Sequence, residues 1–531
     1  MAPSRGRQAT LTIQILVVLS LALYARAGVV ALRRPVSDYY AAGRLVPAML
    51  NGMAIAVCLL PMLALTGFAA ALRQGWDGAS LLVLGGGGGM LLTAFFISPF
   101  LRKFGGYTLS DFLGERFADM GVRPLAVLAV ILCSFPALAL ALMGLGALNV
   151  RVFGVDSGTG LALGVGMLLL CSVVSGMRSA SLTQIAQYAV LFAVSAVALA
   201  ILLWRRDALL PQLGTADLDT VFASFTLEAL SPENSVNRFA LLFCLGSGVA
   251  SLPLILQRSF TTPSIEEARS SFLWALPFAA ALCFVAPTYL SLFGVGSGER
   301  GEIFSAGLLM VGGIAACLAV ASGLLLAIAN AVSYDLYFKS LHRTASTEQR
   351  ILVARAAMVL IAGLAAWAAL AVPDAVFTTA GTAFSLAASA FLPAILLGIW
   401  WKRATPEGAL AGMVAGLGVC LYYMLAPRYI PFAFYESSNF LSDATQDAAS
   451  RYETSRQAYY LADEAGRAAA LLAWEEAARP LANWWGVARD FAALFAVPVG
   501  ALTMIGVSLF TPAPSRDMQS FVEDLRKPQP A

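Results

Sequence analysis

Apolar residues gather in long blocks that recur from one end of the chain to the other, with short polar segments between them. A helix needs roughly 20 apolar residues to cross the hydrocarbon core of a bilayer. The blocks that meet this length lie near residues 9–27, 47–72, 78–100, 122–149, 158–177, 182–204, 236–256, 271–294, 304–334, 351–372, 375–400, 408–426 and 487–511. The pattern predicts an all-α polytopic membrane protein with about thirteen transmembrane helices, whose transmembrane domain covers residues 1–511.

The first of these blocks also has the outline of a cleaved signal peptide. Arg5 and Arg7 precede the apolar stretch, and Ala25, Arg26 and Ala27 follow it. Because apolar blocks continue through the rest of the chain, a retained first helix is the simpler interpretation, and its removal is the alternative.

Composition agrees with a membrane protein and excludes several other classes. Of 531 residues, 59% are hydrophobic and 12% are charged, whereas a soluble domain carries about 25% charged residues. The net charge is +3 and there is no basic stripe, so no nucleic-acid partner is expected. The seven cysteines lie in apolar blocks without a CxxC spacing, which argues against a disulfide framework or a zinc site. No cluster of titratable residues suits catalysis, so the chain is not expected to be an enzyme.

Lysine and arginine are unevenly divided between the two sets of loops. The richer set includes Arg33, Arg34, Arg102, Lys103, Arg258, Lys402 and Arg403. The poorer set holds Arg73, Arg151 and Arg300 in its short loops. Because loops rich in these residues face the cytoplasm, the N-terminus is expected outside and the C-terminus, with a tail over 512–531, inside. The expected location is the bacterial inner (plasma) membrane, with lipid as the surrounding partner.

Residues 427–486 form the one sizeable segment without a membrane block, and they fall on the outer side. Within them, residues 441–480 space their aromatic and leucine side chains as an amphipathic helix does. A helical cap on the outer surface is the plainer interpretation. A docking site for a periplasmic or membrane partner is the alternative.

Helix-breaking residues fall at mid-depth in two of the predicted spans. The second span carries Pro61 and Gly67, and the seventh carries Gly246, Gly248 and Pro253. These spans lie five helices apart, which favours a five-plus-five inverted repeat over residues 47–204 and 236–400 with broken first helices. A run from Gly85 to Gly89 in the third span lacks the Lys-Ser/Thr of a phosphate loop and indicates close helix packing.

Six motifs occur in one order at the ends of the predicted helices. They are SDYYAAGR (37–44), FGGYTLSDFLGERF (104–117), GMRSASLTQIAQY (176–188), QRSFTTPSIEEARSS (257–271), AVSYDLYF (331–338) and LPAILLGIWWKRATPEGALAGM (392–413). With these motifs the chain resembles the sodium:solute symporter family, most closely its branch of bacterial monocarboxylate permeases of the acetate type. The resemblance implies a broken-helix inverted-repeat fold with peripheral helices. It also implies a secondary transporter for a small organic anion, with a monocarboxylate as the leading candidate.

The resemblance further implies a sodium site between the second and ninth spans. Its backbone carbonyls would come from Ala56, Leu59 and Ala316, and its two hydroxyls from the positions of Ala319 and Val320. Sodium is a hard cation that prefers oxygen ligands, and neither alanine nor valine offers a side-chain oxygen. Other polar positions of the family pattern are also altered here, at Val57, Leu60, Leu63, Gln184, Val249, Leu254 and Ser322. Sodium symport through an altered site, sodium-independent transport and a transport-inactive sensor or accessory subunit all stay open, with Na⁺ as the only candidate cofactor.

Few polar side chains remain to line a substrate cavity or carry protons. Proton coupling favours an acidic residue or histidine inside the membrane, whereas Asp335 and Asp374 lie at the ends of predicted spans. The candidates for a substrate cavity are Asn51, Thr66, Ser247, Ser251, Ser322 and Asn330. Each of them is equally suited to packing between helices.

Overall fold

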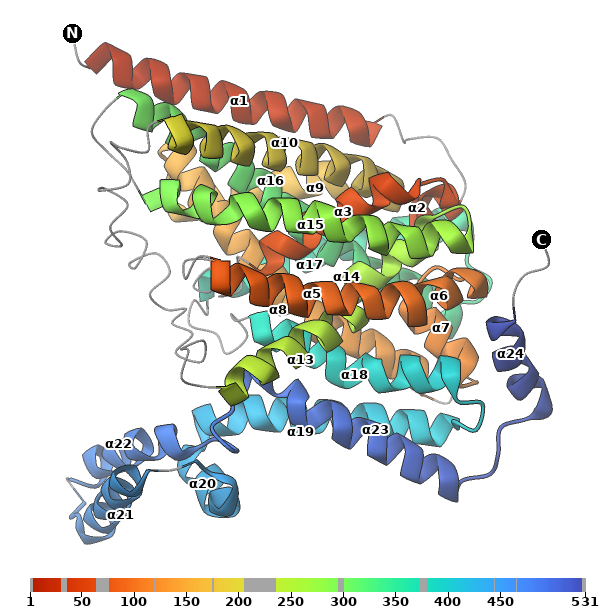
Figure 1. The fold of residues 1–531 in the computed structure, drawn as a ribbon, viewed down its shortest axis with the longest axis vertical. Coiled ribbons are helices and arrows are strands. Elements are labelled where there is room, and N and C mark those ends of the chain that lie inside the picture. Colours follow the sequence, from red (N-terminus) through yellow and green to blue (C-terminus); the bar gives the residue numbers. More distant parts are fainter. Residues whose placement is uncertain are drawn as a thin grey trace.

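The computed structural model describes residues 3–29, 36–63, 76–118, 121–173, 176–204, 235–294, 300–371, 380–443, 445–464 and 466–527. Within these ranges the regular structure is entirely helical. Most of the helices lie side by side along one common direction and form a single bundle (Figure 1).

The described residues of the first half of the chain form nine α-helices. They are α1 (Pro3–Val29), α2 (Val36–Ala41), α3 (Ala48–Leu63), α5 (Trp76–Phe96), α6 (Ser98–Phe104), α7 (Leu109–Arg116), α8 (Val122–Phe153), α9 (Ser157–Ser172) and α10 (Gly176–Trp204). A short 3-10 turn, η1 (Ala42–Arg44), links α2 to the segment before α3.

The second half continues with α13 (Ser235–Ser251), α14 (Pro253–Leu256), α15 (Ile265–Gly294), α16 (Arg300–Asn330), α17 (Thr347–Ala371), α18 (Ala380–Trp400), α19 (Pro406–Tyr429) and α20 (Pro431–Ser438). It ends with α21 (Gln446–Leu461), α22 (Arg467–Ala478), α23 (Ala493–Phe510) and α24 (Arg516–Arg526). The π-helix η6 (Ala331–Leu341) extends α16, and 3-10 turns lie at η5 (Gln257–Thr261), η7 (Asn439–Leu441), η8 (Arg479–Leu481) and η9 (Arg489–Phe491).

Several helices are long and apolar enough to cross a bilayer. Among the described residues, seven single helices qualify, and three bent helix pairs raise the number to ten if each pair is one span. Large apolar side chains also face outward from the bundle, as Leu360 and Trp367 do on α17 at 65% and 66% exposure. An apolar exterior is what a lipid environment requires. The fold is that of a polytopic membrane protein, while the number of thirteen spans stays a prediction.

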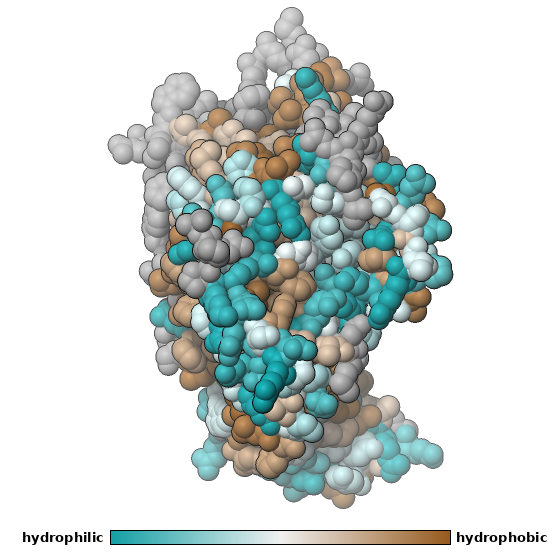
Figure 2. All heavy atoms as spheres, turned by 90° about the vertical axis from the view of Figure 1, so that its right-hand side faces the viewer, coloured by the Kyte–Doolittle hydropathy of each residue, from teal (hydrophilic) through white to brown (hydrophobic). Residues whose placement is uncertain are grey.

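The two ends of the bundle carry different structures. The start of α1 and the helices α20, α21 and α22 lie at one end, and α24 lies at the opposite end (Figure 1). Viewed toward the α24 end, hydrophilic side chains cover much of the surface (Figure 2). Helix α24 is held there by the ion pair between Lys402 and Glu523, at 2.8 Å, and by the Phe521 ring, whose centre is 6.3 Å from that of Phe104. The tail predicted over 512–531 therefore contains a docked helix.

The segment between α19 and α23 forms a small helical unit of its own. Residues 441–480 contain two helices, α21 and α22, in place of one continuous amphipathic helix, because the chain turns extended at Ala462. Tyr452 and Trp474 are buried between them. Tyr460 and Leu461, which the spacing also assigned to an apolar face, are 67% and 85% exposed.

The glycine run in α5 packs against α13. A Cβ atom placed on Gly89 would lie 2.5 Å from the carbonyl oxygen of Gly246, and one on Gly85 would lie 2.9 Å from the Cβ of Leu245. By contrast, a Cβ on Gly88 would meet no atom within 4 Å. The run therefore permits close approach of two helices on one face only, as the sequence predicted.

We expect Gly89→Ala to lower the apparent melting temperature of the purified protein, because the added methyl group meets backbone that cannot move aside. Overpacking of this kind costs about 1–3 kcal/mol. Gly88→Ala is the matched control in the same helix and should cause no loss. Equal melting curves for the two variants would contradict the close packing of α5 on α13.

Candidate functional site

One of the predicted helix breaks lies between α13 and α14. Helix α13 ends at Ser251, Leu252 is extended with φ −66° and ψ 121°, and Pro253 opens α14. The two helical pieces are bent by 46°. Gly246 and Gly248, also predicted as break positions, lie inside α13. That part of the prediction was wrong because these glycines serve helix contacts instead.

The contact made by Gly248 shows this role. A Cβ atom on Gly248 would lie 2.5 Å from the Cβ of Phe384, so the missing side chain lets α13 approach α18. Glycine thus marks a close approach here and not a loss of helical hydrogen bonds.

The break predicted at Pro61 is not seen in the described part of α3. This helix continues through Pro61 to Leu63, and Thr66 and Gly67 lie outside the described residues. In a regular α-helix the carbonyl of Ala56 accepts the N–H of Leu60, which uses one of the two lone pairs of this oxygen. A proline inside a membrane helix is tolerated when neighbouring helices cover the freed carbonyl.

The positions expected to hold sodium do come together between α3 and α16. Ala56 and Leu59 on α3, and Ala319 and Val320 on α16, are all buried, while Ala316 is partly exposed. The Cys58 Sγ lies 3.6 Å from the Ala319 carbonyl oxygen and joins the two helices. The two helices that the resemblance assigns to the sodium site therefore contact each other, while the site itself stays a prediction.

The Ala319 carbonyl is occupied by hydrogen-bond donors from the protein. Gln184 of α10 donates to it from Nε2 at 3.0 Å, and Ser322 donates from Oγ at 3.1 Å. Gln184 Nε2 also lies 3.3 Å from Ser322 Oγ. The three side chains that touch this oxygen, Gln184, Ser322 and Cys58, all approach as donors.

These residues do not fit a sodium ion. Sodium needs several oxygen ligands, whereas the two hydroxyl positions are Ala319 and Val320 and the best-placed carbonyl already accepts an amide. An N–H group also points its positive end toward the place a cation would occupy. Next to the Gln184 amide, Leu254 covers Gly323. A Cβ atom placed on Gly323 would lie 2.2 Å from the Cδ1 of Leu254.

Most of the residues proposed for a substrate cavity are used within the fold. Asn51 donates from Nδ2 to the Arg258 carbonyl at 3.1 Å and to Ser271 at 3.2 Å, and accepts from Thr261 at 3.3 Å. Ser247 bonds the carbonyl of Phe243 in its own helix. These side chains stabilise helix contacts and turns.

Two of the remaining candidates differ in how their polar atoms are used. Ser251 bonds back to the Ser247 carbonyl at 2.6 Å, and so closes the last turn of α13. Asn330, at the end of α16, is 2% exposed and its Oδ1 has no partner. Of the six candidates, Ser322 alone contacts a residue of the sodium position among the described hydrogen bonds.

Arg258 is a polar residue whose place the sequence did not predict. Its position at the end of a span suggested a loop charge, but on η5 it is only 1% exposed. Its Nη1 donates to Ser181 Oγ at 2.8 Å, while Nε and Nη2 have no acceptor. The signal available in the sequence was an arginine directly after an apolar, proline-containing block.

Comparison with known proteins identifies the family. The model of the sodium:solute symporter family matches residues 39–295 and 301–416. The chain belongs to the sodium:solute symporter family. An uncharacterised symporter of Cupriavidus necator is 29% identical over 77% of this chain and 84% of its own. An uncharacterised symporter of Bacillus subtilis is 28% identical over 72% of this chain and 79% of its own.

A solved structure supports the fold. A Na⁺-coupled sialic acid symporter, in a substrate-bound outward-open state, superposes with a TM-score of 0.69 at 17% identity, over 95% of this chain and 98% of its own. The chain is therefore a multi-pass membrane protein with the fold of a secondary transporter.

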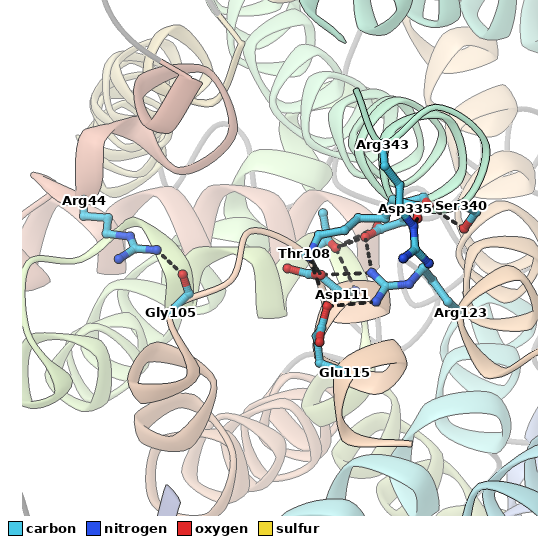
Figure 3. A network of polar contacts seen from close by, with 10 residues as sticks. Arg44, Gly105, Thr108, Asp111, Glu115, Arg123, Asp335, Ser340 and Arg343 are labelled. Atoms are coloured by element: carbon cyan, nitrogen blue, oxygen red, sulfur yellow. Dashed lines mark hydrogen bonds and ion pairs between the residues drawn. The ribbon is translucent and has the colours of Figure 1, made fainter. Parts of the chain in front are cut away.

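Two of the sequence motifs, at residues 104–117 and 331–338, meet in a charged cluster at the α24 end of the bundle. We call Thr108, Asp111, Glu115, Arg123, Asp335 and Lys339 the α7–η6 cluster (Figure 3). Thr108 caps α7 through the N–H of Asp111 and donates to both carboxylate oxygens of Asp335, at 2.9 and 2.7 Å. The cluster ties the first half of the chain to the second.

Arg123 is the cation at the centre of the α7–η6 cluster. Its Nη1 lies 2.9 Å from Asp111 Oδ1 and 3.8 Å from Asp335 Oδ1, and its Nη2 lies 3.2 Å from Glu115. Burial alone would raise the pKa of Glu115, but hydrogen bonds and charge from Lys339 and Arg123 outweigh it and hold the pKa below its usual value. The cluster is thus a network in which two cations, Arg123 and Lys339, lie among three carboxylates.

We expect Arg123→Gln to destabilise the protein, because it leaves the buried carboxylates of Asp111 and Asp335 without their main cation. Removal of one partner from a buried pair costs about 3–5 kcal/mol. The measurement is the apparent melting temperature of the purified transporter.

Arg343→Gln is the control for this substitution. Arg343 is exposed and donates only to the Lys339 carbonyl among the described hydrogen bonds. A melting temperature that falls as far for Arg343→Gln as for Arg123→Gln would argue against a special role of the cluster.

Proposed function

We propose that this secondary transporter moves a small organic anion, a monocarboxylate, across the bacterial plasma membrane without sodium bound between α3 and α16. The observation that carries the proposal is the hydrogen bond from Gln184 to the Ala319 carbonyl. A neutral amide donates to a carbonyl beside the two positions where the family resemblance expects hydroxyl ligands for a cation.

Two further features support an anionic substrate. A buried arginine, Arg258, offers unpaired donors near the same helices. By contrast, groups of three or more His, Cys, Asp or Glu side chains able to hold a metal ion are absent from the part of the chain described. An anion, which offers hydrogen-bond acceptors, suits the unpaired donors of Arg258 better than a cation does.

We expect liposomes that contain the purified protein to take up labelled acetate, lactate or pyruvate at the same rate with and without an inward sodium gradient. Protein-free liposomes set the background. Uptake that rises steeply with the sodium gradient would instead support symport through an altered site. Absence of uptake for any solute would support a sensor or accessory subunit.

A designed variant provides the positive control for sodium. Ala319→Ser with Val320→Ser restores two hydroxyls, and Gln184→Asp replaces the donor by a carboxylate, so the triple variant should gain a melting temperature that rises with Na⁺ but not with K⁺. The double variant that keeps Gln184 should not respond, because the amide still donates to the Ala319 carbonyl.

We also propose an outside N-terminus and a cytoplasmic C-terminus. The richer set of Lys and Arg supports this orientation, and it places α21 and α22 on the periplasmic side. Exposed apolar side chains at Tyr460, Leu461 and Leu472 suit contact with a periplasmic or membrane partner at 441–480.

We expect Gln457→Cys on α21 to react with a membrane-impermeant maleimide in spheroplasts, and Ser520→Cys on α24 to react only after permeabilisation. All seven native cysteines are buried, so the background is low. The opposite labelling pattern would reverse the proposed orientation.

A further inference from the structure

Arg258 combines full burial with unused hydrogen-bonding capacity. The side chain is 1% exposed, and only Nη1 has an acceptor, the Ser181 hydroxyl. Nε and Nη2 together carry three N–H groups that point to no acceptor in the described structure. Carboxylates of the described residues lie outside ion-pair distance of this guanidinium.

An uncompensated charge of this kind is costly inside a protein. Arginine keeps its charge under all ordinary conditions, so it cannot escape the cost by losing a proton. Buried charges are normally paired or hydrogen-bonded. The second partner of Arg258 is therefore expected to be an anion that the chain itself does not supply.

The backbone around Arg258 is fixed, which holds the guanidinium in place. Asn51 of α3 donates to the Arg258 carbonyl, and Thr261 donates to the same oxygen at 2.8 Å. Arg258 lies on η5, which follows α14 after the break at Leu252. A buried cation close to a helix break is well placed to meet a transported solute.

The surroundings of Arg258 are neutral. Cys58 of α3 is close enough to interact electrostatically with the guanidinium, and the same sulfur contacts the Ala319 carbonyl. Ser181 lies one turn before Gln184 on α10, so the two side chains share a helix face. Further along this face, both amide atoms of Gln187 are buried without partners.

We propose that Arg258 binds the carboxylate of the transported monocarboxylate through Nε and Nη2. These two atoms form the edge of the guanidinium that pairs with both oxygens of a carboxylate in a bidentate geometry. The assignment rests on the proposed function and names the residue that recognises the anion. The positive charge of Arg258 then balances the negative charge of the bound carboxylate, as a co-transported cation would otherwise do.

The test measures binding of acetate, lactate and pyruvate to the purified full-length protein in detergent, by titration calorimetry and by the shift in melting temperature. In a buffer free of small carboxylates, Arg258→Gln should be at least as stable as the wild type, because it removes an unpaired buried charge. It should also weaken carboxylate affinity at least about 30-fold. Acetamide, which lacks the charge, should not bind the wild type.

Two variants sharpen the assignment. Arg258→Lys keeps the charge but loses the bidentate edge, so its affinity should fall between those of the wild type and Arg258→Gln. Arg116 is the matched control, a second buried arginine whose Nε and Nη2 donate to the carbonyls of Gly398, Trp401 and Ala404. Arg116→Gln should lower the melting temperature and leave carboxylate affinity unchanged.

Unchanged affinity in Arg258→Gln, or wild-type affinity in Arg258→Lys, would overturn the assignment. Chloride that stabilises the wild type as strongly as acetate would overturn its carboxylate specificity. If the Arg258→Gln variant takes up carboxylates as fast as the wild type, the assignment of Arg258 is wrong and the proposed transport function still holds. Carboxylate binding that depends on Arg258 in a protein without uptake would keep the site and remove the transport function.

Discussion

The hydrogen bond from the Gln184 amide to the Ala319 carbonyl joins α10 to α16 at the position that the family resemblance assigns to sodium. Inside a membrane bundle every polar atom needs a partner from the protein or a ligand. Here α10 supplies a neutral donor to an oxygen that would otherwise attract a cation. The apolar residues around it, Val320 and Leu254, then need no polar partners of their own. One amide therefore makes the loss of the two hydroxyls compatible with a packed core.

The same requirement explains why Arg258 stands out. The α7–η6 cluster shows how the chain normally treats buried charge, with Arg123 placed between Asp111, Glu115 and Asp335. Arg116 likewise has carbonyl partners at the end of α18. Arg258 lacks such compensation on two of its three nitrogens. Arg116 has partners on two of its three nitrogens, whereas Arg258 has a partner on one.

Much of the fold followed from periodicity and motifs, because apolar blocks of helical length are a direct consequence of the bilayer. The α13–α14 break was predicted by Pro253, but Gly246 and Gly248 were misjudged since glycine marks close packing as well as irregular backbone. The replacement at Gln184 was visible, whereas its partner was not, because that partner is a backbone oxygen 135 residues away. Arg258 was counted as a loop charge because sequence alone does not report burial.

The extended residue Leu252 has a structural consequence. It interrupts the helical hydrogen bonds between α13 and α14, so α14 and η5 follow their own direction while glycines bring α13 close to α5 and α18. Directly after η5, the carbonyls of Thr262 and Pro263 accept hydrogen bonds from Arg102 of α6, at 2.6 and 2.8 Å. Leu252 and Arg102 thus lie at the two ends of the segment that carries Arg258, and α6, at the second end, contacts α24 through Phe104 and Phe521.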